Sequence, residues 1–146
     1  MQNKNQVWIW VGVVVVVLAV VFVFVWKPMP SAPNDVPVHA PAGQLVSGFP
    51  SQLVLDSSAP VGSSYSLKYS SSTSQYTAQL NSSNSVSAEF TSYQSYFSAN
   101  GWTIGDSNQS SPTLESIYAT NDTSGVTVVI AAHGTGSQVT INYVTK

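Results

Sequence analysis

The chain has 146 residues, of which 43% are hydrophobic and only 7% are charged, and its four Lys and Arg residues against six Asp and Glu residues give a net charge of −2. Phosphate contacts are made mainly by Lys and Arg, so this composition excludes a nucleic-acid-binding protein of the basic-patch class. The chain has no cysteine, which excludes disulfide bonds, thiolate nucleophiles and Cys-ligated zinc.

Residues 1–6 precede an uninterrupted apolar run at residues 7–26, with the sequence VWIWVGVVVVVLAVVFVFVW. Twenty residues rising 1.5 Å each make about 30 Å of helix, which is the thickness of the hydrocarbon core of a bilayer. We therefore expect a transmembrane helix at residues 7–26, with the lipid bilayer as its partner. The alternative is a cleaved signal peptide, but that needs a shorter apolar run of about 7–15 residues.

A proline-rich stretch follows at residues 27–44 and holds five of the eight prolines of the chain. Proline at this density favours an extended linker. Beyond it, residues 45–146 contain only Lys68 and Lys146 as cations, so little positive charge opposes export. We expect residues 1–6 in the cytoplasm and an exported domain at residues 45–146.

Alternating apolar and polar residues predict two strands at the start of this domain. The segment Ser63–Ser70 places Tyr65, Leu67 and Tyr69 on one face of a strand. After a polar turn at residues 71–74, the segment Gln75–Leu80 alternates in the same way, and the two segments are expected to pair as a hairpin. The apolar positions of the second segment are Tyr76, Ala78 and Leu80.

The period then changes to that of a helix, because apolar residues recur at intervals of four, three and four positions. Ser85 is a suitable N-cap, Glu89 lies in the first turn, and Gly101 is a suitable terminator. This is the helix predicted for the soluble part of the chain. Its apolar stripe consists of Val86, Phe90, Tyr93 and Phe97.

The last part of the chain predicts an antiparallel meander. A short strand at Trp102–Ile104 and a polar loop through Pro112 precede three further strands, at Leu114–Thr120, Val126–Ala131 and Gln138–Val144. The predicted fold is α+β, with an antiparallel sheet in the order β-β-α-β-β-β-β covered by one helix. The last two strands carry no Lys, Glu or Asp, so either they lie inside the sheet or an edge is reserved for a partner strand.

The segment Tyr96–Trp102, YFSANGW, runs from the buried stripe of the helix through its terminal glycine to a strand that begins with tryptophan. Here the chain resembles a group of small, largely uncharacterised single-pass bacterial envelope proteins. They couple an N-terminal anchor to a β-β-α-β domain with such a helix exit. The resemblance covers most of residues 49–146, and it implies a location and a fold but no catalytic residues.

Titratable groups of the exported domain form no catalytic pattern in the sequence. His133 ends a strand without the G-x-S-x-G motif that would accompany a serine nucleophile, and we interpret it as a turn histidine. No catalytic, cofactor-binding or metal-binding residue is therefore predicted. The groups considered are Asp56, Lys68, Glu89, Asp106, Glu115, Asp122, His133 and Lys146.

Two short motifs resemble parts of ligand-binding loops. The run Asp106–Ser110 has the first ligands of a calcium loop, but Ser111 stands at the glycine position and Ile117 at the position of the bidentate Glu. We interpret that run as a solvated loop. The run Gly134-Thr135-Gly136 leads into a strand, whereas a phosphate-binding loop leads into a helix, so we interpret it as a hairpin turn.

The sequence thus predicts a membrane-anchored, extracytoplasmic binding module of the cell envelope without enzymatic activity or cofactor. Its partner would be an envelope protein, a polysaccharide, or a second copy joined by strand pairing. A first alternative is a pilin-like or filament subunit. A second is an envelope hydrolase that uses Asp56, Asp106, Glu115 or Asp122.

Overall fold

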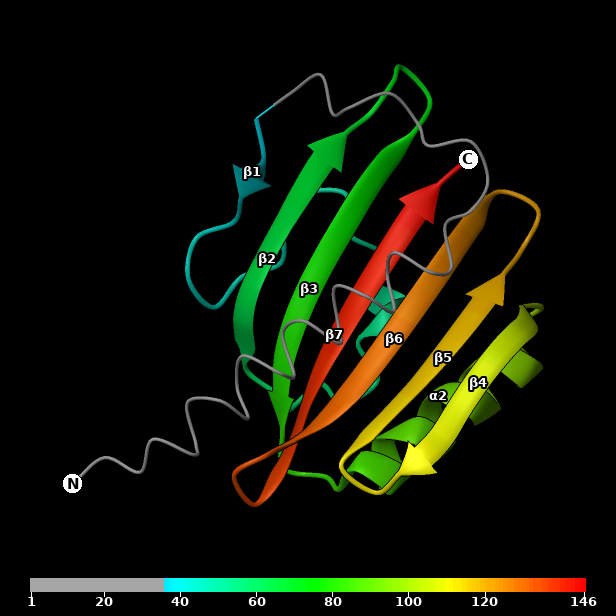
Figure 1. Cartoon of the computed structure of the whole chain (residues 1–146). Coiled ribbons are helices and arrows are strands. Elements are labelled where there is room, and N and C mark those ends of the chain that lie inside the picture. Colours follow the sequence, from blue (N-terminus) through cyan, green and yellow to red (C-terminus); the bar gives the residue numbers. More distant parts are fainter. Residues whose placement is uncertain (1–35) are drawn as a thin grey trace. The chain divides into compact units, whose positions relative to one another are not determined.

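The structure is a computed structural model that describes residues 36–146, and these residues belong to one compact unit. The strands form one antiparallel sheet in the order β1-β2-β3-β7-β6-β5-β4 (Figure 1). The helix α2 carries the chain from β3 to the far edge of this sheet, and the rest of the chain returns as a meander. In chain order the elements are β1 (Val38–His39), the 3₁₀ helix η1 (Ser51–Leu53), β2 (Val61–Lys68), β3 (Ser74–Ser82), α2 (Val86–Ala99), β4 (Thr103–Ser111), β5 (Leu114–Thr120), β6 (Ser124–His133) and β7 (Gly136–Thr145).

Helix α2 covers one face of the sheet, where it packs against β4, β5, β6 and β7, and it lies behind β4 and β5 in Figure 1. The Ser85 side chain caps its first turn by accepting a hydrogen bond of 3.3 Å from the Ala88 amide. Gly101 follows its last turn with φ +74°, a conformation that glycine adopts at little cost. The predicted helix is confirmed, and its whole apolar stripe is buried.

The segment between β1 and β2 covers the rest of the same face. Val46, Phe49, Leu53 and Ala59 belong to the same hydrophobic cluster as the helix stripe and the inward-facing residues of the sheet. The Val46 amide donates a hydrogen bond of 3.0 Å to the Ser64 hydroxyl of β2, which fixes this segment to the sheet. The core of the described residues therefore lies on one side of the sheet.

The strand register decides which residues face this core. Ala78 of β3 pairs with Ile141 of β7, and both are fully buried. Tyr65 of β2 pairs with Thr77, the neighbour of Ala78, and residues paired across strands share a face. Tyr65 and Leu67 therefore lie on the face away from α2. The predicted hairpin is confirmed, with the apolar sides of its two strands on opposite faces of the sheet.

The meander at the end of the chain is also confirmed. β5 pairs with β6, β6 pairs with β7, and β7 pairs with β3. Strands β6 and β7 contain the two segments without Lys, Glu or Asp. Each of these strands thus has a paired strand on both sides. The interpretation that they lie inside the sheet is confirmed, and no charge is needed on them to protect an open edge.

The predicted fold class needs correction, although its α+β character is confirmed. It joined a transmembrane helix to six strands, whereas the structure is an antiparallel sheet of seven strands with one α-helix. Across residues 36–146 no helix has the length and apolar character needed to cross a membrane. The segments predicted as a cytoplasmic N-terminus, residues 1–6, and as a spanning helix, residues 7–26, lie outside the described residues.

Two strands occur where the sequence predicted irregular chain. β1 lies within the proline-rich stretch predicted as a linker, residues 27–44, and pairs with β2. Proline removes only a backbone donor, which a strand at the edge of a sheet can lose without breaking a ladder. β4 extends through residues 105–111, predicted as part of a loop, because a mostly exposed edge strand needs no apolar alternation.

Candidate functional site

Two carboxylates meet around the hydroxyl of Ser82 at the end of β3. Its Oγ lies 2.8 Å from Asp56 Oδ2 and 2.6 Å from Glu89 Oε1. The Asn84 side chain also donates a hydrogen bond of 2.9 Å to Glu89 Oε1. Glu89 is only 2% exposed. Sequence reasoning treated Asp56 and Glu89 as separate groups and did not predict that both would contact one hydroxyl.

This cluster connects three parts of the chain and leaves little room for chemistry on a ligand. The hydroxyl has one proton, so it donates to one carboxylate at a time. Hydrogen bonds from Ser58, and next from Ser82, hold the pKa of Asp56 below its usual value. We interpret the cluster as an anchor that ties the η1–β2 loop and the start of α2 to β3.

The other groups considered from the sequence lie apart from this cluster. His133 pairs with Gly136 at the end of the β6–β7 hairpin, which confirms the turn interpretation. Glu115 lies on the core side of β5, 5% exposed, and its Oε2 has no hydrogen-bond partner among the described residues. Lys146 donates from Nζ to the Asn121 carbonyl at 3.0 Å. Within residues 36–146, no three His, Asp or Glu side chains are close enough to hold a metal ion.

The two loop-like motifs have structural roles. The run predicted as a solvated loop, Asp106–Ser110, is exposed but belongs to strand β4, so the loop interpretation is wrong. The run Gly134-Thr135-Gly136 is the hairpin turn between β6 and β7, as interpreted, and Gly134 adopts φ +59° there. Gly136 is required for a different reason, because a Cβ at this position would overlap the Ser82 carbonyl oxygen.

Both edges of the sheet carry features that oppose the addition of another strand. The Ala40 amide donates to the Ser64 carbonyl of β2, so the alternate positions 37, 39 and 41 direct their backbone nitrogens outward. Pro37 and Pro41 have no amide hydrogen at two of these three positions. At the other edge, β4 has two register irregularities and carries Asp106, features that disfavour regular pairing.

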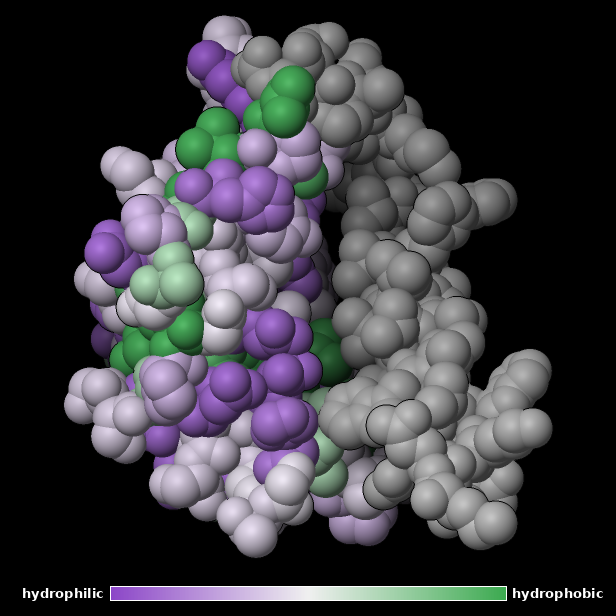
Figure 2. Space-filling view, turned by 90° about the vertical axis from the view of Figure 1, so that its left-hand side faces the viewer, coloured by the Kyte–Doolittle hydropathy of each residue, from purple (hydrophilic) through white to green (hydrophobic). Residues whose placement is uncertain are grey.

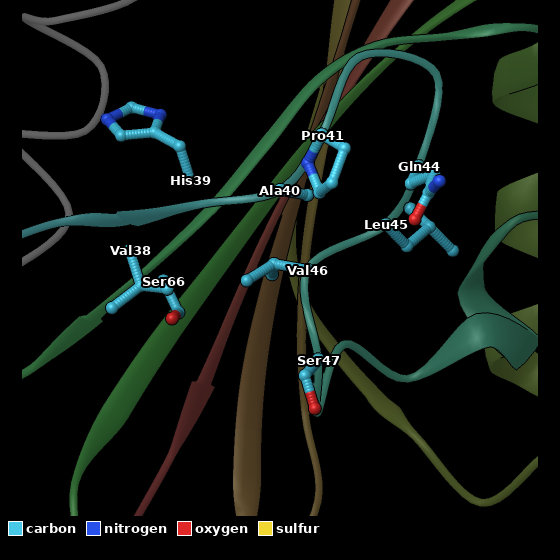
Figure 3. A pocket seen from close by; sticks show the side chains of 9 residues that line it. All are labelled: Val38, His39, Ala40, Pro41, Gln44, Leu45, Val46, Ser47 and Ser66. Carbon is cyan, nitrogen blue, oxygen red and sulfur yellow. The ribbon is translucent and has the colours of Figure 1, made fainter.

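A groove lies beside β1 and consists of two adjoining cavities of about 360 and 670 Å³, which share Val38, Ser47 and Ser66. Val38 and His39 project to opposite sides of β1, and both line the smaller cavity together with Val46 (Figure 3). The His39 ring also lies 5.6 Å from the Tyr65 ring. The surface on this side of the molecule mixes apolar and hydrophilic residues (Figure 2). The groove offers aliphatic contacts, serine hydroxyls, the His39 imidazole and the Lys68 ammonium group.

The sheet face opposite α2 has a different character. We call it the polar face and define it by the side chains of β2, β3, β5, β6 and β7 that point away from the helix. None of its positions on these five strands holds Asp, Glu, Lys or Arg, and its titratable side chains other than tyrosine are limited to His133 at the end of β6. Its centre, on β3 and β7, consists of amides and hydroxyls: Gln75, Thr77, Gln79, Asn81, Gln138, Thr140 and Asn142.

The side chains of the polar face are cross-linked by hydrogen bonds. Gln75 Nε2 donates to Thr77 Oγ1 at 3.3 Å, and Thr77 Oγ1 donates to Asn142 Oδ1 at 2.9 Å. Gln138 Nε2 donates to Asn81 Oδ1 at 3.3 Å. These contacts hold the side chains in place before a ligand arrives, which lowers the entropy lost on binding.

Sequence reasoning missed this surface. Its signal was present in β7, where Gln138, Thr140 and Asn142 alternate with buried Val139 and Ile141. Sequence reasoning predicted this strand and noted that it carries no Lys, Glu or Asp, but a single strand does not show that its neighbours carry amides and hydroxyls on the same side. Strand order and register were needed to join these residues into one surface.

No protein-family model, curated protein or solved structure matches this chain. The similarity to single-pass envelope proteins, inferred from the segment Tyr96–Trp102, therefore stays a prediction. The functional interpretation depends on the polar face, the edge groove and the distribution of titratable groups.

Proposed function

We propose that residues 36–146 act as a non-enzymatic binding module that presents the polar face to its partner. The single observation that carries this proposal is that the polar face, on five adjacent strands, holds amides, hydroxyls and tyrosines beside a few aliphatic side chains and His133, with no carboxylate, ammonium or guanidinium group. An uncharged, hydrogen-bonding surface of this kind suits recognition, whereas acid–base catalysis needs titratable groups that converge on one point.

The arrangement of the titratable groups supports the same proposal. Two carboxylates come together, those of Asp56 and Glu89, and an oxygen of each accepts a hydrogen bond from the Ser82 hydroxyl. Glu115 is buried on the core side of the sheet. His133 lies at the far end of a hairpin. The hydrolase alternative requires two of Asp56, Asp106, Glu115 and Asp122 to approach one substrate bond. That geometry is disfavoured because Asp56 contacts Ser82, Asp106 lies on the edge strand β4 and Glu115 faces the core.

We further propose that the module works in the cell envelope, outside the cytoplasm. The support comes from the sequence: residues 45–146 contain two lysines, no arginine and no cysteine, and serine and threonine dominate the polar residues. Protease added to intact and to envelope-permeabilised cells tests the location, with detection of the intact domain by antibody. Cleavage in permeabilised cells with an intact inner membrane supports the proposal, and full protection contradicts it.

Binding and catalysis are separated by one set of assays on the full-length chain. We expect no release of product from peptidoglycan, ester or phosphate-ester substrates, and stable association with a fixed envelope component in pull-down. Turnover that disappears in His133→Ala would replace the binding proposal with the hydrolase. Filaments seen by electron microscopy of expressing cells would favour the structural-subunit alternative.

A further inference from the structure

We propose that the polar face binds a neutral, hydroxyl-rich polysaccharide that lies across the strands. This inference depends on the proposed function and names the class of its ligand. The alternative occupants of the face are a charged polymer and a second protein. Charge, hydrogen bonding and the placement of two tyrosines each argue for the polysaccharide.

The absence of charge on the polar face favours an uncharged ligand. A sulfate, phosphate, carboxylate or ammonium group that is brought onto the face loses hydration and finds no opposite charge to compensate. The nearest carboxylate is at the margin, where Asp106 of the edge strand β4 pairs with Tyr118 on the same side of the sheet, and Lys146 donates to the Asn121 carbonyl. A neutral ligand pays no such desolvation cost.

The hydrogen-bonding groups of the polar face match a ligand that both donates and accepts. Each amide has an acceptor oxygen and two N–H donors. The Asn142 oxygen accepts from Thr77, which leaves the two Asn142 N–H groups to donate outward, and Gln138 uses one N–H toward Asn81. Sugar hydroxyls act as donor and acceptor at once, so they can satisfy both kinds of group along such a row.

Two tyrosines bracket one row of this face. Tyr65, Thr77, Asn142, Thr127 and Tyr118 are successive cross-strand partners on β2, β3, β7, β6 and β5. Four strand spacings separate the two tyrosines, so their backbones lie about 19 Å apart. This row could therefore support several consecutive sugar units, with an aromatic ring near each end to contact their apolar C–H faces.

The tyrosine near the β4 edge is accommodated by glycines in both neighbouring strands. A Cβ at Gly105 would lie 3.2 Å from Tyr118 Cδ1, and a Cβ at Gly125 would lie 3.7 Å from the Tyr118 hydroxyl. The ring thus occupies space that side chains at those two positions would fill. At the opposite end, the Tyr65 ring lies 5.6 Å from that of His39.

A second protein fits this face less well. The centre of a protein–protein interface is depleted in charged residues and enriched in large apolar and aromatic ones. The centre of the polar face also lacks charge, but it has Gln79, Thr140 and Asn142 on its two central strands where an interface would have large apolar or aromatic side chains. Leu67 and Val144 lie in another row of the sheet, and Val129 of β6 is the aliphatic partner of Thr140 beside the centre.

The test measures binding of the immobilised full-length chain to dextran, amylose and laminarin, with heparin as a polyanion. We expect at least one neutral polymer to bind, heparin not to bind, and the affinity to change little between about 0.05 and 0.5 M NaCl, because screening acts on charges. Gln79→Glu adds a charge to the polar face and should weaken binding about tenfold or more. Gln94→Glu makes the same change on the exposed side of α2 and should leave binding unchanged.

The outcomes separate this inference from the proposed function. Equal effects of Gln79→Glu and Gln94→Glu, or salt-sensitive binding to heparin alone, would overturn the assignment to the polar face. If no polysaccharide binds while the chain retains a protein component of the envelope, the polysaccharide inference fails and the binding function stands. Turnover of a substrate would remove the proposed function itself. Equal thermal unfolding of both variants checks that each is folded.

Discussion

The hydroxyl of Tyr93 donates a hydrogen bond of 2.9 Å to the backbone carbonyl of Leu53, forty residues earlier in the chain. Tyr93 is 1% exposed and belongs to α2, whereas Leu53 ends the 3₁₀ helix η1. This contact joins the two segments that together cover the core side of the sheet. It therefore links the closure of the core to a single hydroxyl group.

Tyr93→Phe should lower the free energy of unfolding by about 1 kcal/mol or somewhat more, because the buried Leu53 carbonyl loses its partner. Tyr96→Phe on the same helix, at a half-buried position, is the control and should cost less. Urea unfolding of the full-length chain at pH 7 measures both. Equal losses in the two variants would contradict the role assigned to the Tyr93 hydroxyl.

The same tyrosine predicts a loss of stability in alkali. Burial, and next the nearby Glu89 carboxylate, raise the pKa of Tyr93 above its usual value of 10.0. A raised pKa favours the protonated folded state, so its contribution is complete below pH 10 and is lost as the pH rises toward the folded-state pKa. Wild type should lose more stability than Tyr93→Phe between pH 9 and pH 12. An equal loss of unfolding free energy in both proteins over this pH range would contradict the prediction.

Ser82→Ala removes the hydroxyl that lies between Asp56 and Glu89. We expect a loss of about 1–3 kcal/mol in unfolding free energy, because the buried Glu89 loses a hydrogen-bond donor. Ser83→Ala, at the exposed neighbouring position, should change stability by less than about 0.5 kcal/mol. A Ser82→Ala variant as stable as Ser83→Ala would show that the cluster does not anchor the fold.

Acid should weaken the fold through Asp56. Its pKa is held below the usual 3.8, mainly by the Ser58 hydroxyl and next by Ser82. A depressed pKa stabilises the folded state above pH 3.8, and this contribution is lost as the pH falls through the folded-state pKa. Asp56→Asn should reduce the fall in melting temperature between pH 5 and pH 2.5. An unchanged fall would assign the acid sensitivity to other groups.

Two buried glutamates should respond in opposite ways to the same substitution. Glu115→Leu removes a carboxylate whose Oε2 has no partner among the described residues, so stability should stay equal or rise by about 1 kcal/mol. Glu89→Leu removes the acceptor of Ser82 and Asn84 and should cost about 2 kcal/mol or more. Urea unfolding at pH 7 compares them. A large loss in Glu115→Leu would reveal a partner for that carboxylate.

Gly136→Ala should be more damaging than Gly134→Ala in the same hairpin. A Cβ at Gly136 would overlap the Ser82 carbonyl and lie 2.9 Å from Ser83 Cα, so backbone must move, at a cost of about 2 kcal/mol or more. A Cβ at Gly134 would meet open space. Alanine there is disfavoured only by the positive φ of +59°, which should lower the free energy of unfolding by about 1 kcal/mol. The reverse order in thermal unfolding would contradict the close packing at Gly136.

The helix and the final meander could be predicted because their signals are local. The stripe from Val86 to Phe97, the cap at Ser85 and the terminator at Gly101 lie within 17 consecutive positions. The strands β5, β6 and β7 follow one another through short turns, so sequence order and spatial order agree. Periodicity and turn chemistry are enough in both cases.

The sequence by itself determined which residues alternate in each strand, and it placed Tyr65 with Leu67 and Tyr76 with Ala78. Only the tertiary structure decided that the first pair lies on the polar face and the second faces the core, because a shift of one residue in register turns a strand over. It also brought Asp56 and Glu89 to Ser82 and joined residues 65, 77, 142, 127 and 118 into one row. These relationships depend on pairing between distant segments, which no local pattern records.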